Sequence, residues 1–287
     1  MQEIASGVFI ETAYEGVNVA AILTDEGIIA IDAPSYPRDA HDWVSRISRL
    51  HGRGVRYLLL TGYHGDRILN TRWFGVPIIA SQATAERLDD YDRRYPQSLL
   101  EGLSLRNPQL GRELTSGPVD RVAISFTGHI SLHSGRGLVN LVSRPGPNAG
   151  SAWVLWPEAG ILFSGDSVVA GAQPPLSGLL LAQWLAGLKE LNNDKRKPRL
   201  IVPGRGEPGG PELATSMITY LHHISAVVEQ HIAAGGTRQE LAGRAPEILD
   251  YFATPEFGAE WYQREVILGL QRAYDQLVTT AGLPLVE

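Results

Sequence analysis

The stretch that decides the fold is Val55-Arg-Tyr-Leu-Leu-Leu60 followed by Thr61-Gly-Tyr-His-Gly-Asp-Arg67. Its first half is a largely apolar run of strand length, which predicts a strand buried on both faces. Its second half is a glycine-containing loop that carries His64 and Asp66 directly after the strand. Imidazole and carboxylate groups commonly hold metals or transfer protons. This loop is therefore the first candidate functional site.

The loop resembles the T-H-x-H-x-D-H signature of the metallo-β-lactamase superfamily. Four other segments resemble motifs of the same superfamily and follow in the same order, at residues 27–32, 144–151, 151–166 and 200–206. In the family these are a strand with a structural aspartate, a G-H-T-x-G-S loop, a hairpin ending in a metal-bridging aspartate, and a P-G-H-G loop. The resemblance runs from about residue 7 to 206. It implies an α/β fold, the four-layer αββα sandwich, with its site on loops at the strand ends.

The resemblance also implies a site for up to two zinc ions. Four positions that hold histidines in the family carry other residues here: Gly62, Arg67, Pro147 and Arg205. By carry-over, one metal would use positions 62, 64 and 147, and the other positions 66, 67 and 205, with position 166 bridging them. The side chains that can still ligate a metal are His64, Asp66 and Asp166. They are divided between the two subsites.

The replacing arginines change the electrostatics of such a site. A guanidinium is always protonated and has no lone pair for a metal. Two unit charges about 4 Å apart interact by about 4 kcal/mol at an effective dielectric constant of 20, and a divalent ion beside an arginine is repelled about twice as strongly. Carboxylates can instead pair with guanidinium groups through charge-assisted hydrogen bonds. We therefore expect Arg67 or Arg205 to form ion pairs with Asp66 or Asp166.

Two functions remain open at this point. The first is a metal-free, non-catalytic protein that binds a small anionic ligand in the cleft, through Tyr63, Arg67, Asp166 and Arg205. The second is a residual hydrolase, in which His64 and Asp66 act in acid–base catalysis or hold one zinc or other divalent ion together with Asp166. The loss of four ligands favours the first hypothesis, with no cofactor expected. The retention of both aspartates favours the second.

Composition narrows the class of protein. The chain has 287 residues, a net charge of −6 and no cysteine, so disulfides and thiolate sites are excluded. The acidic balance argues against a nucleic-acid partner. The first residues carry no secretory signal pattern, and no apolar run has the length of a membrane span. We therefore expect a cytoplasmic protein that does not enter a membrane.

Hydrophobic periodicity predicts the order of the elements. Strands are expected at 8–11, 17–23, 27–31, 55–60, 78–79, 123–126, 137–142, 152–156, 161–163 and 200–202. Helices are expected at 37–51, within the polar segment 82–118, and at 179–191. The acidic and basic run 89–94 is expected on a solvated helix face. His129 and His133 are expected on the surface of a hairpin.

The chain changes character after Gly206, which divides it into a main domain (1–206) and a C-terminal helical extension (207–287). An apolar stripe at helical spacing predicts a helix from about 211 to 235. A capping box that begins at Thr237 predicts a second helix, and Thr254-Pro255 predicts the start of a third, which runs to about 280. We expect the extension to pack on the main domain, with a homodimer interface as the alternative.

Overall fold

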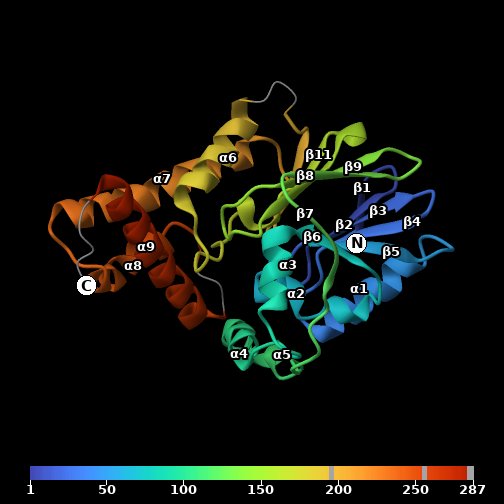
Figure 1. The fold of residues 1–287 in the computed structure, drawn as a ribbon, viewed down its shortest axis with the longest axis horizontal. Coiled ribbons are helices and arrows are strands. Elements are labelled where there is room, and N and C mark those ends of the chain that lie inside the picture. Colours follow the sequence, from blue (N-terminus) through green and yellow to red (C-terminus); the bar gives the residue numbers. More distant parts are fainter. Residues whose placement is uncertain (194–196, 254–256, 283–287) are drawn as a thin grey trace.

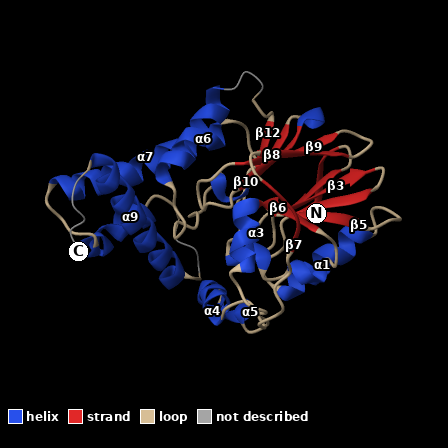
Figure 2. Ribbon diagram, viewed as in Figure 1, coloured by secondary structure: helices blue, strands red, loops and turns tan. Residues whose placement is uncertain are grey.

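The computed structural model describes residues 1–193, 197–253 and 257–282 (Figure 1). Two β-sheets are stacked and carry helices on their outer faces, as the colours in Figure 2 make visible. The first sheet holds seven strands in sequence order: β1 (Gln2–Ala5), β2 (Val8–Glu11), β3 (Val19–Thr24), β4 (Gly27–Ile31), β5 (Val55–Leu59), β6 (Ile78–Ser81) and β7 (Val122–Phe126). The second has the order β12-β11-β10-β9-β8: β8 (His129–His133), β9 (Leu138–Ser143), β10 (Ala152–Trp156), β11 (Ile161–Phe163) and β12 (Leu200–Val202).

The directions of the strands determine where the loops of the site lie. Strands β1 to β4 pair antiparallel, whereas β4, β5, β6 and β7 pair parallel. In the second sheet only β11 and β12, among the described strands, pair parallel. Neighbouring parallel strands end at the same edge of a sheet, so the loops after β4 and β5 meet at one edge, and those after β11 and β12 meet at another.

Helices complete the four layers. The helices of the main domain are α1 (Pro37–Ser48), α2 (Gly65–Ile68), α3 (Gln82–Asp89), α4 (Gln97–Arg106), α5 (Pro108–Gly111) and α6 (Leu181–Asn193). Trp43 and Ile47 of α1 are fully buried against the outer face of the first sheet. Leu188 of α6 is buried in a cluster with Trp153 and Leu162 on the outer face of the second sheet. A third apolar cluster lies between the sheets, so the expected αββα sandwich is present.

The C-terminal helices are α7 (Glu212–Ala233), α8 (Ala245–Leu249) and α9 (Ala259–Ala281). They share the apolar cluster that α6 forms on the second sheet, through buried residues such as Met217 and Leu270. Helix α9 also contacts α4 of the main domain. The predicted start of the last helix at Thr254-Pro255 lies outside the described residues. No helix in the described ranges is long and apolar enough to cross a membrane.

Several local expectations were wrong. Strand β5 is buried only at Leu58 and Leu59, because Val55 to Tyr57 lie toward its more open start. The segment 82–118 is broken into three helices, and residues 90–94 form an irregular loop rather than a helix face. Pro96 and Pro108 mark these interruptions, because proline cannot donate within a helix. Strand β1 was not predicted and β8 was given no bounds, whereas the expected exposure of His129 and His133 on a hairpin is confirmed.

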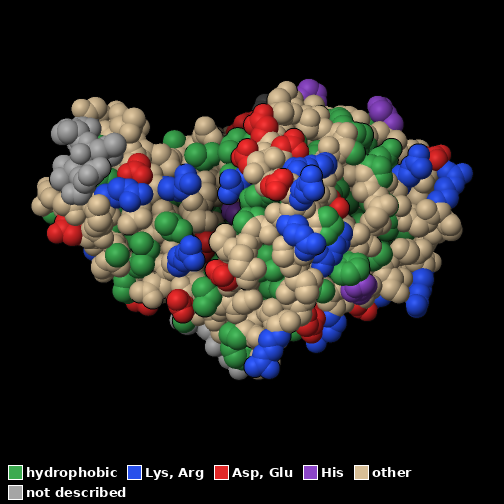
Figure 3. Space-filling model, turned by 60° about the horizontal axis from the view of Figure 1, so that its bottom comes forward, with side chains coloured by type: hydrophobic (Ala, Val, Ile, Leu, Met, Phe, Trp, Pro, Cys, Tyr) green, Lys and Arg blue, Asp and Glu red, His purple; other side chains and the backbone are tan. Residues whose placement is uncertain are grey.

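One half of the predicted capping box at the second C-terminal helix is present, since the N–H of Thr237 donates to Glu240 Oε2 at 2.8 Å, but the Thr237 hydroxyl donates to the same oxygen and caps no backbone N–H. This segment opens a six-residue 3-10 helix (Gln239–Arg244), which is followed by the five-residue α8. On the face drawn in Figure 3, acidic and basic side chains are interspersed over both the helical lobe and the sandwich.

Candidate functional site

The loops that carry the candidate residues meet at one end of the sandwich. Asp32 follows β4, and its carboxylate accepts hydrogen bonds from the N–H of Thr61 (2.9 Å) and from its hydroxyl (2.6 Å), at the end of the parallel strand β5. Asp32 has a φ of 57°, and it is the non-glycine residue with positive φ in the described part of the chain. Such a conformation costs about 1 kcal/mol or more, and it persists where surrounding contacts fix it.

Asp66, in α2, is the meeting point of two arginines. Its Oδ2 accepts from Nη1 of Arg106 at 2.7 Å and from Nη2 of Arg205 at 2.5 Å. Arg106 is at the end of α4, and Arg205 follows β12, where its Nη1 donates to the carbonyl of Gly16 at 2.5 Å. A Cβ on Gly16 would lie 1.3 Å from Arg106 Nη2, so only glycine fits at this crossing. All three charged side chains are at most 5% exposed.

Asp166, after β11, is contacted by Arg67, Arg205 and His64. Arg67 donates through Nε to its Oδ2 at 3.2 Å and through Nη2 to its Oδ1. Arg205 Nε lies 3.2 Å from Oδ1, close enough for an ion pair although its N–H is not aligned for a hydrogen bond. Arg67 also donates through Nη1 to Asp32 Oδ2 at 2.5 Å. The cluster thus contains three carboxylates and three guanidinium groups, and the ion pairs expected from the sequence are present.

The orientation of His64 is fixed by its two hydrogen-bond partners. Its Nδ1 lies 3.0 Å from Asp166 Oδ2, and its Nε2 lies 3.1 Å from Asn148 Nδ2. Asn148 Oδ1 accepts the N–H of Gly150 at 2.9 Å, so the amide NH₂ of Asn148 faces the imidazole. Nε2 must therefore accept, and Nδ1 carries the proton that it donates to Asp166.

The charges of the cluster shift the pKa values of the carboxyls. Burial by itself would raise the pKa of Asp66, but Arg205 and Arg106 outweigh it and lower this pKa to about 2. Burial opposes Arg205 and Arg67 in the same way at Asp166, whose pKa is lowered well below its ordinary value. Burial raises the pKa of Asp32. The Asp32 carboxyl nevertheless accepts hydrogen bonds from the N–H and hydroxyl of Thr61 and from Arg67. Because hydrogen bonds from donors favour the ionised form, we regard Asp32 as a carboxylate.

The donors that remain do not fit a zinc site. Zinc binds three or four protein ligands through free lone pairs, but guanidinium groups engage the carboxylates of Asp66 and Asp166. The Nε2 lone pair of His64 accepts from Asn148. Within the described ranges, no group of three or more His, Asp or Glu side chains is arranged to hold a metal ion. A cation between the aspartates would have to displace Arg205 and Arg67.

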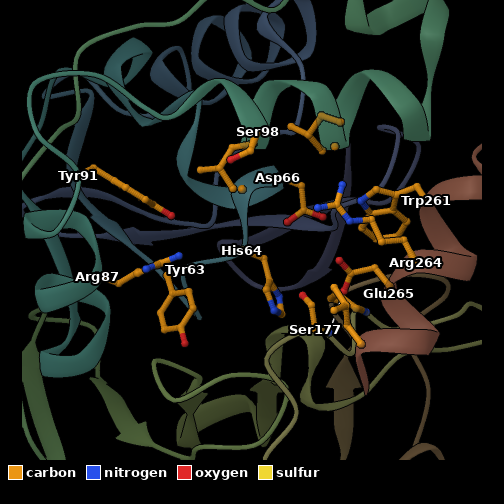
Figure 4. A pocket seen from close by; sticks show the side chains of 16 residues that line it. Tyr63, His64, Asp66, Arg87, Tyr91, Ser98, Ser177, Trp261, Arg264 and Glu265 are labelled. Atoms are coloured by element: carbon orange, nitrogen blue, oxygen red, sulfur yellow. Dashed lines mark hydrogen bonds between the residues drawn. The ribbon is translucent and has the colours of Figure 1, made fainter. Parts of the chain in front are cut away.

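A pocket of about 250 Å³ opens next to the cluster (Figure 4). His64 and Asp66 lie at its floor, Tyr63, Arg87 and Tyr91 on one side, and Trp261, Arg264 and Glu265 of α9 on the other. Its remaining wall is largely apolar and includes Leu99, Leu103, Pro175 and Leu268. The pocket therefore lies between the main domain and the C-terminal extension.

The structure brings most of the predicted site residues together but assigns them different positions. Tyr63, His64 and Asp66 line the pocket, whereas Arg67 and Arg205 are buried behind Asp66 and are not among its lining residues. The anion-binding role expected for these two arginines stays a prediction, and in this structure both of them pair with the aspartates. His129 and His133 are exposed on β8, outside this site.

Sequence reasoning missed Arg106, Asn148 and the residues of α9. Arg106 lies in an ordinary helical segment with no motif around it, so no local signal distinguishes it. Asn148 is next to the replaced ligand position Pro147, and its polarity within that loop was the one available signal. Trp261 and Arg264 reach the site only because α9 folds back onto α4.

The fold and the ordered motif positions are those of an αββα sandwich of the metallo-β-lactamase type. The model of the metallo-beta-lactamase superfamily matches residues 16–206, so the chain belongs to that superfamily. Its structure is similar to a metallo-beta-lactamase family protein from Thermus thermophilus, with a TM-score of 0.69, 16% identity, and coverage of 98% of this chain and 95% of that one. It is also similar to a metallo-beta-lactamase from Pontibacter korlensis, with a TM-score of 0.60, 19% identity, and coverage of 77% and 97%. At these identities the similarity shows the fold alone.

Proposed function

We propose that this chain is a metal-independent member of the superfamily that binds a small anionic ligand in the cleft beside the old metal site. The observation that carries the proposal is the pairing of Asp66 and Asp166 with Arg67 and Arg205. Guanidinium groups supply there the positive charge that a metal would otherwise supply. Removing them to admit a metal would break buried ion pairs, at a cost of about 3–5 kcal/mol each.

The anion-binding part of the proposal rests on the pocket. Asp66 is already neutralised by two arginines, and Glu265 Oε2 accepts the N–H groups of Leu176 (3.0 Å) and Ser177 (2.9 Å). Arg87 and Arg264 are both exposed and line the pocket from opposite sides. The available charge at the pocket mouth is therefore positive, which favours an anion.

A residual hydrolase remains the second candidate. It is favoured by the His64–Asp166 pair at 3.0 Å, because a carboxylate that orients an imidazole is a common arrangement for proton transfer. Against it, the imidazole Nε2 that would take a proton already accepts from Asn148.

Elemental analysis of the purified protein, together with calorimetric titration of zinc and of a panel of small anions, tests the proposal. We expect less than about a tenth of an equivalent of metal, no change in melting temperature with chelator, and saturable binding of at least one anion. Hydrolysis of β-lactam, thioester and phosphodiester substrates should not respond to added metal. About one equivalent of zinc, manganese or iron, removed by chelator with loss of an activity, would establish the hydrolase instead.

A further inference from the structure

The pocket has features that narrow the class of ligand beyond its charge. Its volume of about 250 Å³ corresponds to about eight water molecules, or a ligand of about ten non-hydrogen atoms. Its apolar walls come from α4, through Leu99 and Leu103, and from α9, through Trp261 and Leu268. A ligand that is only a charged group would leave these walls unused.

The charges of the pocket argue against a highly charged ligand. Arg87 and Arg264 contribute two positive charges, and the lining also contains the carboxylates of Asp66 and Glu265. The guanidinium of Arg87 also interacts with two neighbours. Its carbon lies 5.1 Å from the centre of the Tyr91 ring, and its Nη1 lies 4.0 Å from Asp90 Oδ2. A polyphosphate carries more negative charge than Arg87 and Arg264 can neutralise, whereas a single carboxylate can pair with one guanidinium.

Trp261 connects the ligand pocket to the buried cluster. Its ring lies 5.6 Å from the guanidinium carbon of Arg106, which in turn binds Asp66. A Cβ at Gly102 of α4 would lie 3.7 Å from Trp261 Nε1, which is ordinary van der Waals contact, so the indole packs directly on α4 at this glycine. The indole is thus held between α4 and Arg106 at the edge of the pocket that it lines.

Building on the proposed function, we propose that the ligand is a small amphipathic monocarboxylate recognised by helix α9. Its carboxylate pairs with Arg264, with Arg87 on the opposite side of the mouth. Its apolar body lies against the apolar lining that Leu99, Leu103 and Leu268 contribute. The C-terminal extension is then the part of the chain that determines which ligand binds.

Calorimetric titration with four probes tests the ligand class: 3-phenylpropionate, its uncharged amide, acetate and inorganic phosphate. We expect 3-phenylpropionate to bind most tightly. The amide should bind about 10-fold more weakly because it loses the charge-assisted hydrogen bond. Acetate should bind about 100-fold more weakly because it lacks the buried ring. Tighter binding of phosphate or equal binding of acetate would overturn this inference while leaving anion binding intact. Absence of binding by all three anions would overturn both.

Two variants with a matched control test the site. Arg264→Gln should weaken binding of 3-phenylpropionate about 10-fold, whereas Arg272→Gln, an exposed arginine of the same helix outside the pocket lining, should leave it unchanged. Leu268→Gln should weaken binding of 3-phenylpropionate about 10-fold, because it removes part of the apolar lining. The melting temperature of each variant verifies folding. Unchanged binding in Leu268→Gln, or equal losses in the two arginine variants, would place the ligand elsewhere.

Discussion

Arg205 Nη2 lies 2.5 Å from Oδ2 of Asp66, so that a buried guanidinium and a buried carboxylate meet where a histidine and an aspartate would share a metal in relatives. The superfamily resemblance assigns both positions to the second metal subsite. Two further arginines and two further aspartates extend this pair into a closed network. In this network arginines, rather than a metal ion, compensate the charge of the buried carboxylates.

The first prediction concerns the cost of breaking the network. Arg67→Met should destabilise the protein by about 3–5 kcal/mol, because it leaves Asp32 and Asp166 buried with less compensation. Urea denaturation measures this loss. Arg136→Met, which removes an exposed ion pair with Asp25, is the control and should cost at most about 1 kcal/mol. Equal losses of unfolding free energy in the two variants would show that the buried network stabilises the protein no more than an exposed ion pair does.

The second prediction concerns acid. The folded pKa values of Asp66 and Asp166 lie below the unfolded value near 3.8. The unfolded state therefore binds more protons between that value and about pH 2, and the stability that these groups contribute above pH 4 falls as the pH falls through this window. Unfolding free energies measured from pH 5 to 2 should decline less steeply in Asp66→Asn than in the exposed control Asp92→Asn. Parallel profiles would contradict the lowered pKa of Asp66.

The third prediction concerns the tautomer of His64. Nitrogen-15 NMR of the imidazoles should show a protonated Nδ1 and an unprotonated Nε2 for the signal that disappears in His64→Gln. Asn148→Ala should shift the Nε2 resonance, because this nitrogen loses the hydrogen bond from the amide. The substitution should also cost about 1 kcal/mol of stability. Protonation at Nε2 in the parent protein would refute the assigned network.

The fourth prediction concerns restoring a metal site. Gly62→His, Arg67→His, Pro147→His and Arg205→His together should bring back zinc binding, since they replace two cations with ligands. Asn148 stands in the way, because its Nδ2 would lie 3.3 Å from a Cβ at position 62. Adding Asn148→Ala should therefore raise zinc affinity by at least about 10-fold, as a freed His64 gains a lone pair for the metal. Zinc titration of the four-fold and five-fold variants measures the difference, and equal affinities would show that Asn148 does not block the site.

The sequence by itself determined the fold and the chemistry of the central cluster. Strand-length apolar runs and five ordered motifs sufficed for the αββα sandwich, because periodicity and loop position are local properties of the chain. The charge balance at residues 66, 67, 166 and 205 sufficed to predict ion pairs, because buried carboxylates require a cation whatever the details of the backbone.

Only the tertiary structure decided which groups complete the site. Arg106 reaches Asp66 across 40 residues, and Trp261 reaches the pocket from a helix that closes it about 200 residues after His64. No pattern near either residue marks this role, because it depends on how α4 and α9 pack on the sandwich. The hydrogen bond from Asn148 to His64 likewise depends on two loops that meet only in the folded chain. Long-range packing therefore decided that Arg106 joins the buried cluster, and that Arg87 and Arg264 are the cations at the mouth of the pocket.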